Sequence, residues 1–373
     1  MKNIVRSLVI VMASILLASW GGSGHYIISS GITKFFNEEM QTFSNWVGYI
    51  ADHASDADYR KDEDPLEGPR HYIDLDGYWE FIRDGEISMS LEENIDKYGE
   101  DFVEENGYLP WATIDTYNSL VENLKQGNWD SARFFAADLG HYVADGHMPL
   151  HLTVNFDGQV TGNHGIHSRY ESQMVNAFSS QIEYEGQEIQ EIDTVDKYIF
   201  NYLYQNYAYK DSVLLADLLA DDSAKSVNPN TESHEYTTIY TTTLWELTGD
   251  FTIMLFQSAS HAFTELLYTA WIEAGKPDLT ALDAKNPLYD RLKIFPNPSN
   301  SVSQIEYSLN SFSTVSLILN SADGKISEIL LHDQKQPGKY SFNLDTQTYP
   351  DGIYFLNMKT GNLNISKKLL VLE

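Results

Sequence analysis

The chain has 373 residues, of which 42% are hydrophobic, and its 54 Asp and Glu residues against 24 Lys and Arg residues give a formal net charge of -30. This composition is typical of a globular protein and excludes a disordered or fibrous chain. The length exceeds what one hydrophobic core usually holds, which predicts two domains. An acidic surface excludes binding of a phosphate polymer through Lys and Arg contacts, so an anionic substrate would need another source of positive charge.

The N-terminus predicts a secretory signal peptide over residues 1–19. It has a positive start, a short apolar run and a small-residue cleavage site, namely Lys2 and Arg6, residues 8–17, and Ala18-Ser19. We expect the mature chain to begin at Trp20; the alternative is an uncleaved anchor. Export permits disulfides, but the chain has no cysteine, so a metal ion is the remaining strong cross-link.

Helical periodicity dominates the next part of the chain, up to about Gly275. Segments 129–143 and 245–274 carry apolar residues at helical spacing, which indicates helices with a buried face. Gly275-Lys276-Pro277 ends the last helix, and residues 281–291 form a polar connector. We therefore predict a mainly helical domain over residues 20–280.

From residue 292 the period of the apolar pattern changes to two. Segments 303–309, 314–319 and 352–358 alternate, and turn residues at 322–324 and 350–352 separate them. Acidic and basic side chains balance at eight each from Asp290 onward, so the whole net charge lies before it. The predicted fold is mainly α, a helical domain followed by a small all-β sandwich over residues 292–373.

Histidines and carboxylates gather in one stretch of the helical part. The stretch holds His141, His147, His151, His164 and His167, interleaved with Asp138, Asp145, Asp157 and Glu171. His141 and Asp145 are four residues apart on an apolar helix and share one face.

His167 and Glu171 repeat that spacing on the next helical segment, and His151 follows a break at Pro149 and can turn back to the same centre. An imidazole and a carboxylate one turn apart grip a divalent metal with little freedom to lose. Zinc suits imidazole and carboxylate ligands without thiolate, although manganese and iron accept the same ligand types.

Several segments together resemble the zinc signature of the S1/P1 nuclease and zinc-dependent phospholipase C superfamily. They are Trp20-Gly21-Gly22-Ser23-Gly24-His25, His71-Tyr72-Ile73-Asp74, residues 141–151 (HYVADGHMPLH) and His167-Ser168-Arg169-Tyr170-Glu171. The resemblance covers roughly residues 20–271 and implies a helical zinc-cluster domain with phosphodiesterase activity.

The resemblance implies a cluster of three zinc ions. The first ion would take His71, His141, Asp145 and an upstream Asp; the second, His151, His167 and Glu171; the third, His25, Asp145 and the terminal amine and carbonyl of Trp20. The amine is a ligand only if it is the free terminus, so cleavage after Ser19 would complete the site.

The upstream Asp has three candidates, because Asp52 and Asp56 lie near Asp58. By resemblance to the family, Asp58 stands in the ligand position. The family also holds the phosphate with a cation three residues further on, where Lys61 stands beside Arg60. Position favours Lys61, whereas the planar fork of Arg60 suits a phosphate better. We expect Asp58, Lys61 and Asp145 to be catalytic.

Clustered zinc would supply the positive charge that an acidic surface lacks and would lower the pKa of a bridging water, so that a metal-bound hydroxide attacks the phosphodiester. In the nuclease branch an aromatic residue and an Asp bind a flipped-out base, and Tyr72 and Asp74 occupy those places. The alternative is that Tyr72 packs in the core and Asp74 orients His71.

The leading hypothesis is a secreted nuclease acting on single-stranded DNA or RNA. The alternative is a zinc-dependent phospholipase C acting on phospholipid head groups, and a third hypothesis is a surface protein that keeps zinc only for structure. Residues 295–298 (FPNP) through 367–369 (KKL) resemble the type A sorting domain of Bacteroidota. That resemblance implies a secreted or outer-membrane surface protein whose partner is the export machinery, and we predict no stable protein partner.

Overall fold

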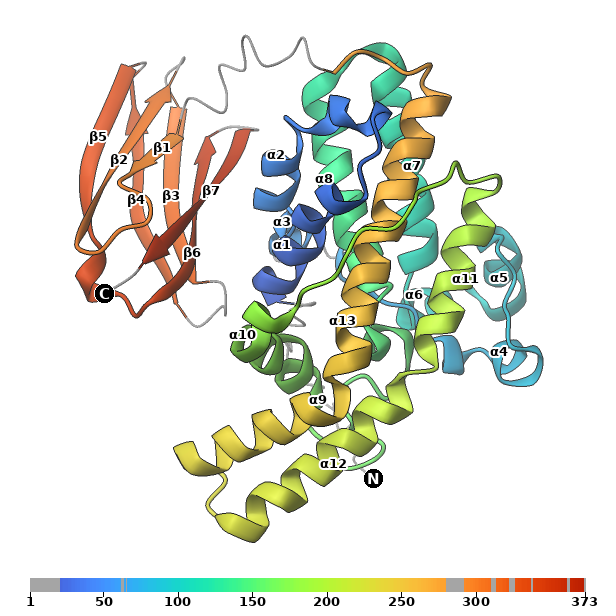
Figure 1. Cartoon of the computed structure of the whole chain (residues 1–373). Helices are drawn as coiled ribbons and strands as arrows, with labels where there is room; N and C mark the ends of the chain where they lie inside the picture. Colours follow the sequence, from blue (N-terminus) through green and yellow to red (C-terminus); the bar gives the residue numbers. More distant parts are fainter. Residues whose placement is uncertain are drawn as a thin grey trace, which may run out of the picture.

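The computed structural model describes residues 21–61, 64, 66–279, 292–309, 313–321, 326–336, 338–360 and 363–371. Within these ranges the chain is helical from Gly21 to Glu273 and then all β, as predicted (Figure 1). The predicted signal peptide, Trp20 and the predicted connector at 281–291 lie outside them. Among the described helices, none is both long and apolar enough to cross a membrane.

The helical part combines four long helices with shorter ones. Its α-helices are α1 (Gly21–Gly31), α2 (Val47–Asp52), α3 (Asp56–Arg60), α4 (Trp79–Asp84), α5 (Leu91–Tyr98), α6 (Glu100–Asn106), α7 (Leu109–Gln126), α8 (Trp129–Asp145), α9 (Ile166–Ser168), α10 (Val175–Phe178), α11 (Val195–Tyr207), α12 (Lys210–Val227) and α13 (His234–Glu273). Helix α8 extends the predicted segment 129–143 by one half-turn, to Asp145.

Helix α13 is 40 residues long and runs through the helical part, packed against α7 and α8 (Figure 1). It begins well before the predicted residue 245, because the Ser233 hydroxyl accepts a hydrogen bond from the Tyr236 amide at 3.1 Å and caps the first turn. Its C-terminal half is buried, with Phe263, Leu266 and Leu267 in the main apolar core. This core fixes α8 and therefore the direction in which the end of α8 presents its side chains.

The C-terminal part forms two antiparallel sheets, as the period of two predicted. The strands are β1 (Leu292–Phe295), β2 (Val302–Leu309), β3 (Ser313–Ser321), β4 (Ser327–Lys335), β5 (Gly338–Asp345), β6 (Gly352–Thr360) and β7 (Leu363–Val371). One sheet has the order β1-β2-β5 and the other β4-β3-β6-β7. Buried side chains from both sheets, such as Ile305 and Leu317, form one apolar cluster between them, which makes this part a β-sandwich.

Helix α8 approaches α13 closely at Gly140, one residue before His141. A Cβ atom at Gly140 would lie 2.6 Å from Cε1 of Phe263, which is well inside carbon–carbon contact distance. Phe263 is fully buried and has little room to move. The contact therefore requires glycine at this position.

We predict that Gly140→Ala lowers the free energy of unfolding by about 1–3 kcal/mol, because overpacking outweighs the better helix propensity of alanine. Gly48→Ala in α2 is the matched control, since nothing lies within 4 Å of the added Cβ. The control should keep or slightly raise stability. Urea denaturation of both variants tests this, and equal changes in the two would contradict the close contact at Gly140.

Candidate metal centre and adjoining pocket

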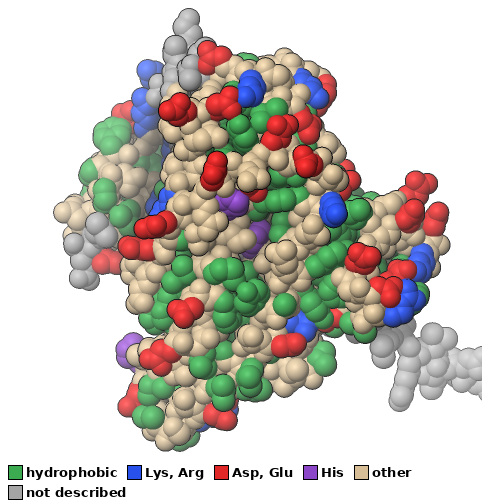
Figure 2. All heavy atoms as spheres, turned by 45° about the vertical axis from the view of Figure 1, so that its right-hand side comes forward, with side chains coloured by type: hydrophobic (Ala, Val, Ile, Leu, Met, Phe, Trp, Pro, Cys, Tyr) green, Lys and Arg blue, Asp and Glu red, His purple; other side chains and the backbone are tan. Residues whose placement is uncertain are grey.

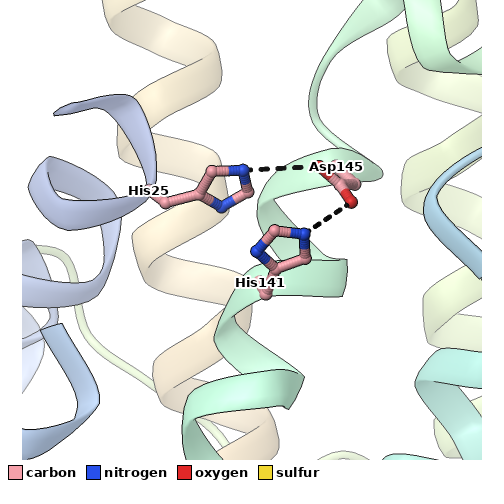
Figure 3. Close-up of side chains that lie close together, drawn as sticks. All are labelled: His25, His141 and Asp145. Atoms are coloured by element: carbon pink, nitrogen blue, oxygen red, sulfur yellow. Dashed lines mark ion pairs between the residues drawn. The ribbon is translucent and has the colours of Figure 1, made fainter. Parts of the chain in front are cut away.

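The end of α8 and the start of α1 bring His141, Asp145 and His25 together (Figure 3). The Nε2 atom of His141 lies 3.2 Å from Asp145 Oδ2, and the Nε2 atom of His25 lies 3.5 Å from Asp145 Oδ1. The two imidazole rings stack with their centroids 4.0 Å apart. All three side chains are buried, so a carboxylate and two imidazoles share an interior site.

A second group consists of Asp58, His71 and the same His141. Asp58 Oδ1 lies 3.5 Å from His71 Nδ1 and 3.7 Å from His141 Nε2. Of the competing carboxylates, Asp56 contacts His53 Nδ1 at 2.7 Å. The geometry thus brings Asp58, the residue that the family pattern favours, to the histidines.

The third group is His151, His167 and Glu171. Glu171 Oε2 lies 3.2 Å from His167 Nε2 and 3.6 Å from His151 Nε2. Glu171 stands in a π-helical turn, Arg169–Met174, which follows the short helix α9, so the segment is wider than the α-helix that the spacing predicted. Such turns occur often at functional sites, because they redirect a side chain without ending the helix.

Backbone carbonyls orient most of these imidazoles. The Nδ1 atoms that face a carbonyl oxygen are those of His141 (Ala54 O, 2.6 Å), His151 (His71 O, 2.8 Å) and His167 (Phe156 O, 3.2 Å). A carbonyl oxygen only accepts, so Nδ1 carries a hydrogen and Nε2 is the nitrogen turned toward the carboxylates. This is the arrangement in which protein imidazoles bind metal ions.

The three groups fit divalent cations. Glu171 is 1% exposed, and neither of its oxygens forms a hydrogen bond within the described part of the chain. A buried carboxylate is unfavourable without a positive charge beside it. Imidazole and carboxylate ligands in a chain without cysteine suit zinc.

The charges at the site also favour a bound cation. Burial would raise the pKa of Asp145, but the charges of His141 and His151 hold it well below its usual range. Burial would lower the pKa of His141, and the charges of Asp145 and Asp58 instead raise it to about 9. Asp145 therefore stays ionised and attracts positive charge to this point.

The two cations next to Asp58 have different partners. Lys61 Nζ lies 2.7 Å from Asp58 Oδ1, within the cluster. Arg60 instead forms a two-pronged ion pair with buried Asp138, at 2.7 and 3.1 Å, and contacts Glu67. Lys61 is thus the cation positioned at the candidate ligand groups, whereas Arg60 is paired with the buried carboxylates Asp138 and Glu67.

A pocket of about 160 Å³ adjoins the Asp58, His71 and His141 group and the His151, His167 and Glu171 group. It is lined by Tyr72, Asp74, Glu105, Leu150 and Phe156 together with His71, His151 and His167. Figure 2 shows histidine side chains reaching the surface beside hydrophobic ones. Tyr72 thus lines a cavity and is absent from the apolar core clusters of the described residues.

Sequence reasoning missed two carboxylates here. Glu105 lines the pocket, and buried Glu67 lies 3.4 Å from His71 Nε2. Glu67 precedes His71 by four residues, which is the spacing that drew attention to other pairs. His147, by contrast, belongs to none of the three groups and contacts Val143 O at 2.7 Å.

Residues 293–372 match the family described as secretion system C-terminal sorting domain. The β-sandwich is a secretion sorting domain. It marks the protein for type IX secretion, to the outside or the cell surface of a Bacteroidota-type bacterium, and implies contact with the secretion machinery. This confirms the resemblance and the location predicted from the sequence.

Two solved structures align with most of the chain at low similarity. The alpha toxin of Clostridium absonum has 9% identity and a TM-score of 0.40, covering 95% of this chain and 98% of its own. The alpha-toxin of an avian strain of Clostridium perfringens has 10% identity and a TM-score of 0.38, covering 94% and 98%. No curated protein sequence matches the chain. The function of the helical part therefore has to be argued from its own residues.

The pocket carboxylate Asp74 gives a prediction for pH dependence. Burial, together with the charge of Asp76, raises the pKa of Asp74 from 3.8 to about 7. Between these pH values the folded protein binds more protons than the unfolded chain, so this group makes stability fall as the pH rises. Asp74→Asn removes the effect and should gain stability relative to wild type on going from about pH 4 to about pH 8.

Urea midpoints at the two pH values measure this difference. Asp211→Asn is the control, because the Asp211 side chain is 80% exposed and should not alter the pH profile. Parallel profiles for wild type and Asp74→Asn would show that the pKa of Asp74 is not raised.

Proposed function

We propose that the helical domain is a zinc-dependent phosphodiesterase of the S1/P1 type that hydrolyses single-stranded nucleic acid outside the cell. The observation that carries the proposal is that three candidate ligand groups lie side by side around Asp145, two of them sharing His141. The Oδ2 atom of Asp145 faces His71 and His141, and its Oδ1 atom faces His25 and His151. A structural metal site needs one closed set of ligands, whereas this arrangement supports several ions side by side, an arrangement that many phosphatases and nucleases use.

Three zinc ions fit the ligand groups. Asp58, His71, His141 and Asp145 would hold the first, and His151, His167 and Glu171 the second. His25 and Asp145 would hold the third, together with the amine and carbonyl of Trp20. Bound zinc supplies Lewis-acid charge that neutralises phosphate oxygens and makes a nearby water more acidic.

The side chains of the protein would bind and orient the phosphate. Lys61 is 18% exposed and lies beside Asp58, so its ammonium can reach a phosphate oxygen at the edge of the cluster. The protein otherwise has a formal net charge of -30, which makes this local cation and the metal centre the means of attracting an anion. Catalysis then depends on Asp58, Lys61 and Asp145 being held in place by α3 and α8.

The adjoining pocket supports a substrate with a flat group next to the phosphate. Tyr72 and Phe156 offer aromatic faces, and Asp74 offers a carboxyl group to the edge of a base. Stacking on an aromatic ring is tolerant of sequence and needs an unpaired base, which favours single-stranded DNA or RNA.

The same pocket gives a specific reason to keep phospholipase C as the second candidate. Aromatic rings with Asp74 and Glu105 also suit the quaternary ammonium group of a choline head group. Such an enzyme would cleave lecithin vesicles and leave nucleic acid intact.

We predict that the mature protein contains about three zinc ions per chain and that Asp145→Asn loses both metal and hydrolysis, because one ligand serves more than one ion. His147→Ala is the control, since this equally buried histidine lies outside the ligand groups and should keep the zinc. Elemental analysis and a phosphodiesterase assay measure the two effects. Equal metal loss in both variants would refute the assignment of ligands.

We predict that Tyr72→Ala lowers hydrolysis of single-stranded DNA or RNA by roughly one to two decades, which corresponds to about 1–3 kcal/mol of lost stacking. Hydrolysis of a small phosphodiester without a base should hardly change, because the metal ligands are untouched. Tyr268→Ala is the control, since this half-buried tyrosine on α13 contacts Glu39, away from the pocket.

The comparison separates the alternatives. A loss of both activities together with a loss of stability would mean that Tyr72 acts through packing. Cleavage of lecithin vesicles by the wild type, with no activity on nucleic acid, would replace the nuclease by the phospholipase.

A further inference from the structure

His71 is turned the opposite way from His25, His141 and His167, which present Nε2 to the carboxylates. Its Nδ1 atom, and not Nε2, faces the cluster, at 3.0 Å from Asp145 Oδ2 and 3.5 Å from Asp58 Oδ1. Its Nε2 atom faces Glu67 Oε1 at 3.4 Å. A metal-facing Nδ1 requires the hydrogen on Nε2. Within the described residues Nε2 forms no hydrogen bond at its present geometry, and Glu67 Oε1 is the carboxylate oxygen that faces it.

Glu67 is itself held from several sides. It is 1% exposed and accepts a hydrogen bond from the Tyr142 hydroxyl on Oε1. Arg60 Nε and Arg70 Nη1 lie 3.3 and 3.4 Å from Oε2. A buried carboxylate with this many donors has one permitted position, so it can fix the ring that contacts it.

The partners of Glu67 come from the same three segments that supply the Asp58, His71 and His141 group. Arg60 follows Asp58 by two residues in α3, and Glu67 precedes His71 by four. On α8, Tyr142 adjoins His141, and Asp138, one turn earlier, holds Arg60 at 2.7 Å. The network therefore ties together the backbones on which three ligands stand.

We propose that Glu67 is a positioning residue that sets the orientation and tautomer of His71, and that Arg60, Tyr142 and Asp138 hold Glu67 for this task. The inference rests on the zinc centre of the proposed function. It also assigns Arg60 to the support of the site, and leaves Lys61 as the cation for the substrate.

Glu67→Gln tests the proposal with little change in volume. The amide group replaces one acceptor oxygen by a donor, so either His71 or the Arg60 and Tyr142 side loses its acceptor. Carboxylates that orient a metal-binding imidazole typically account for 10–100-fold in metal affinity. We expect roughly that loss of zinc affinity, measured by competition with a chelator of known affinity.

Glu265→Gln is the matched control. Glu265 is likewise a buried carboxylate that accepts a tyrosine hydroxyl, from Tyr198 at 2.6 Å, but it lies outside the ligand groups. It should lower the melting temperature without changing zinc affinity. Tyr142→Phe is a milder second variant, because it removes only the hydroxyl. It should weaken zinc binding by less than Glu67→Gln does, and it still tests the proposal if Glu67→Gln does not fold.

Wild-type zinc affinity in Glu67→Gln, or in Tyr142→Phe where the first variant does not fold, would overturn the positioning role and leave the proposed function standing. The same loss of zinc affinity in Glu265→Gln would also overturn the role, because any buried carboxylate would then act alike. A wild-type protein that binds no zinc would overturn the proposed function itself.

Discussion

The burial of Asp145 is the constraint on which the helical part depends. Its carboxylate is fully buried, on a helix whose other buried residues are largely apolar, and His25, His71, His141 and His151 surround it. An ionised carboxylate in such a place is tolerated only with positive charge beside it. The packing of α8 against α13, the position of α1 and the turn that ends at His71 all serve to bring that charge to one point.

This concentration of charge reconciles an acidic protein with a phosphate substrate. The formal net charge of -30 repels anions at long range, whereas the cluster attracts cations at short range. Fixed carboxylates can assemble divalent ions only if the histidines do not hold protons in their place. The carbonyl partners of His141, His151 and His167 commit the Nδ1 hydrogen and turn Nε2 toward the site, where a divalent ion would replace the proton that the raised pKa of His141 otherwise retains.

The sequence predicted the parts of the structure that depend on local spacing. The four-residue interval of His141 and Asp145, the period of two after residue 292 and the end of α13 near Gly275 follow from helix and strand geometry. The partners of Arg60 did not, because Asp138 is 78 residues away and only the tertiary packing joins them. Glu67 was missed although it precedes His71 by only four residues, because a short 3-10 turn, Gly68–His71, and not an α-helix joins them. The π-helical turn around Glu171 was missed because the spacing of His167 and Glu171 also fits an α-helix.

The sorting domain and the metal centre are built from separate sets of residues. The β-sandwich has its own apolar core and balanced charge, and no residue of its described strands belongs to a candidate metal group. The helical part has the excess acidic charge and all the candidate ligands. The two parts touch where Lys368 of β7 lies over the ring of Tyr26 in α1, next to the candidate ligand His25. The candidate ligands of the described residues stand on α1, α3, α8, α9 and the turns Gly68–His71, Pro149–Leu152 and Arg169–Met174.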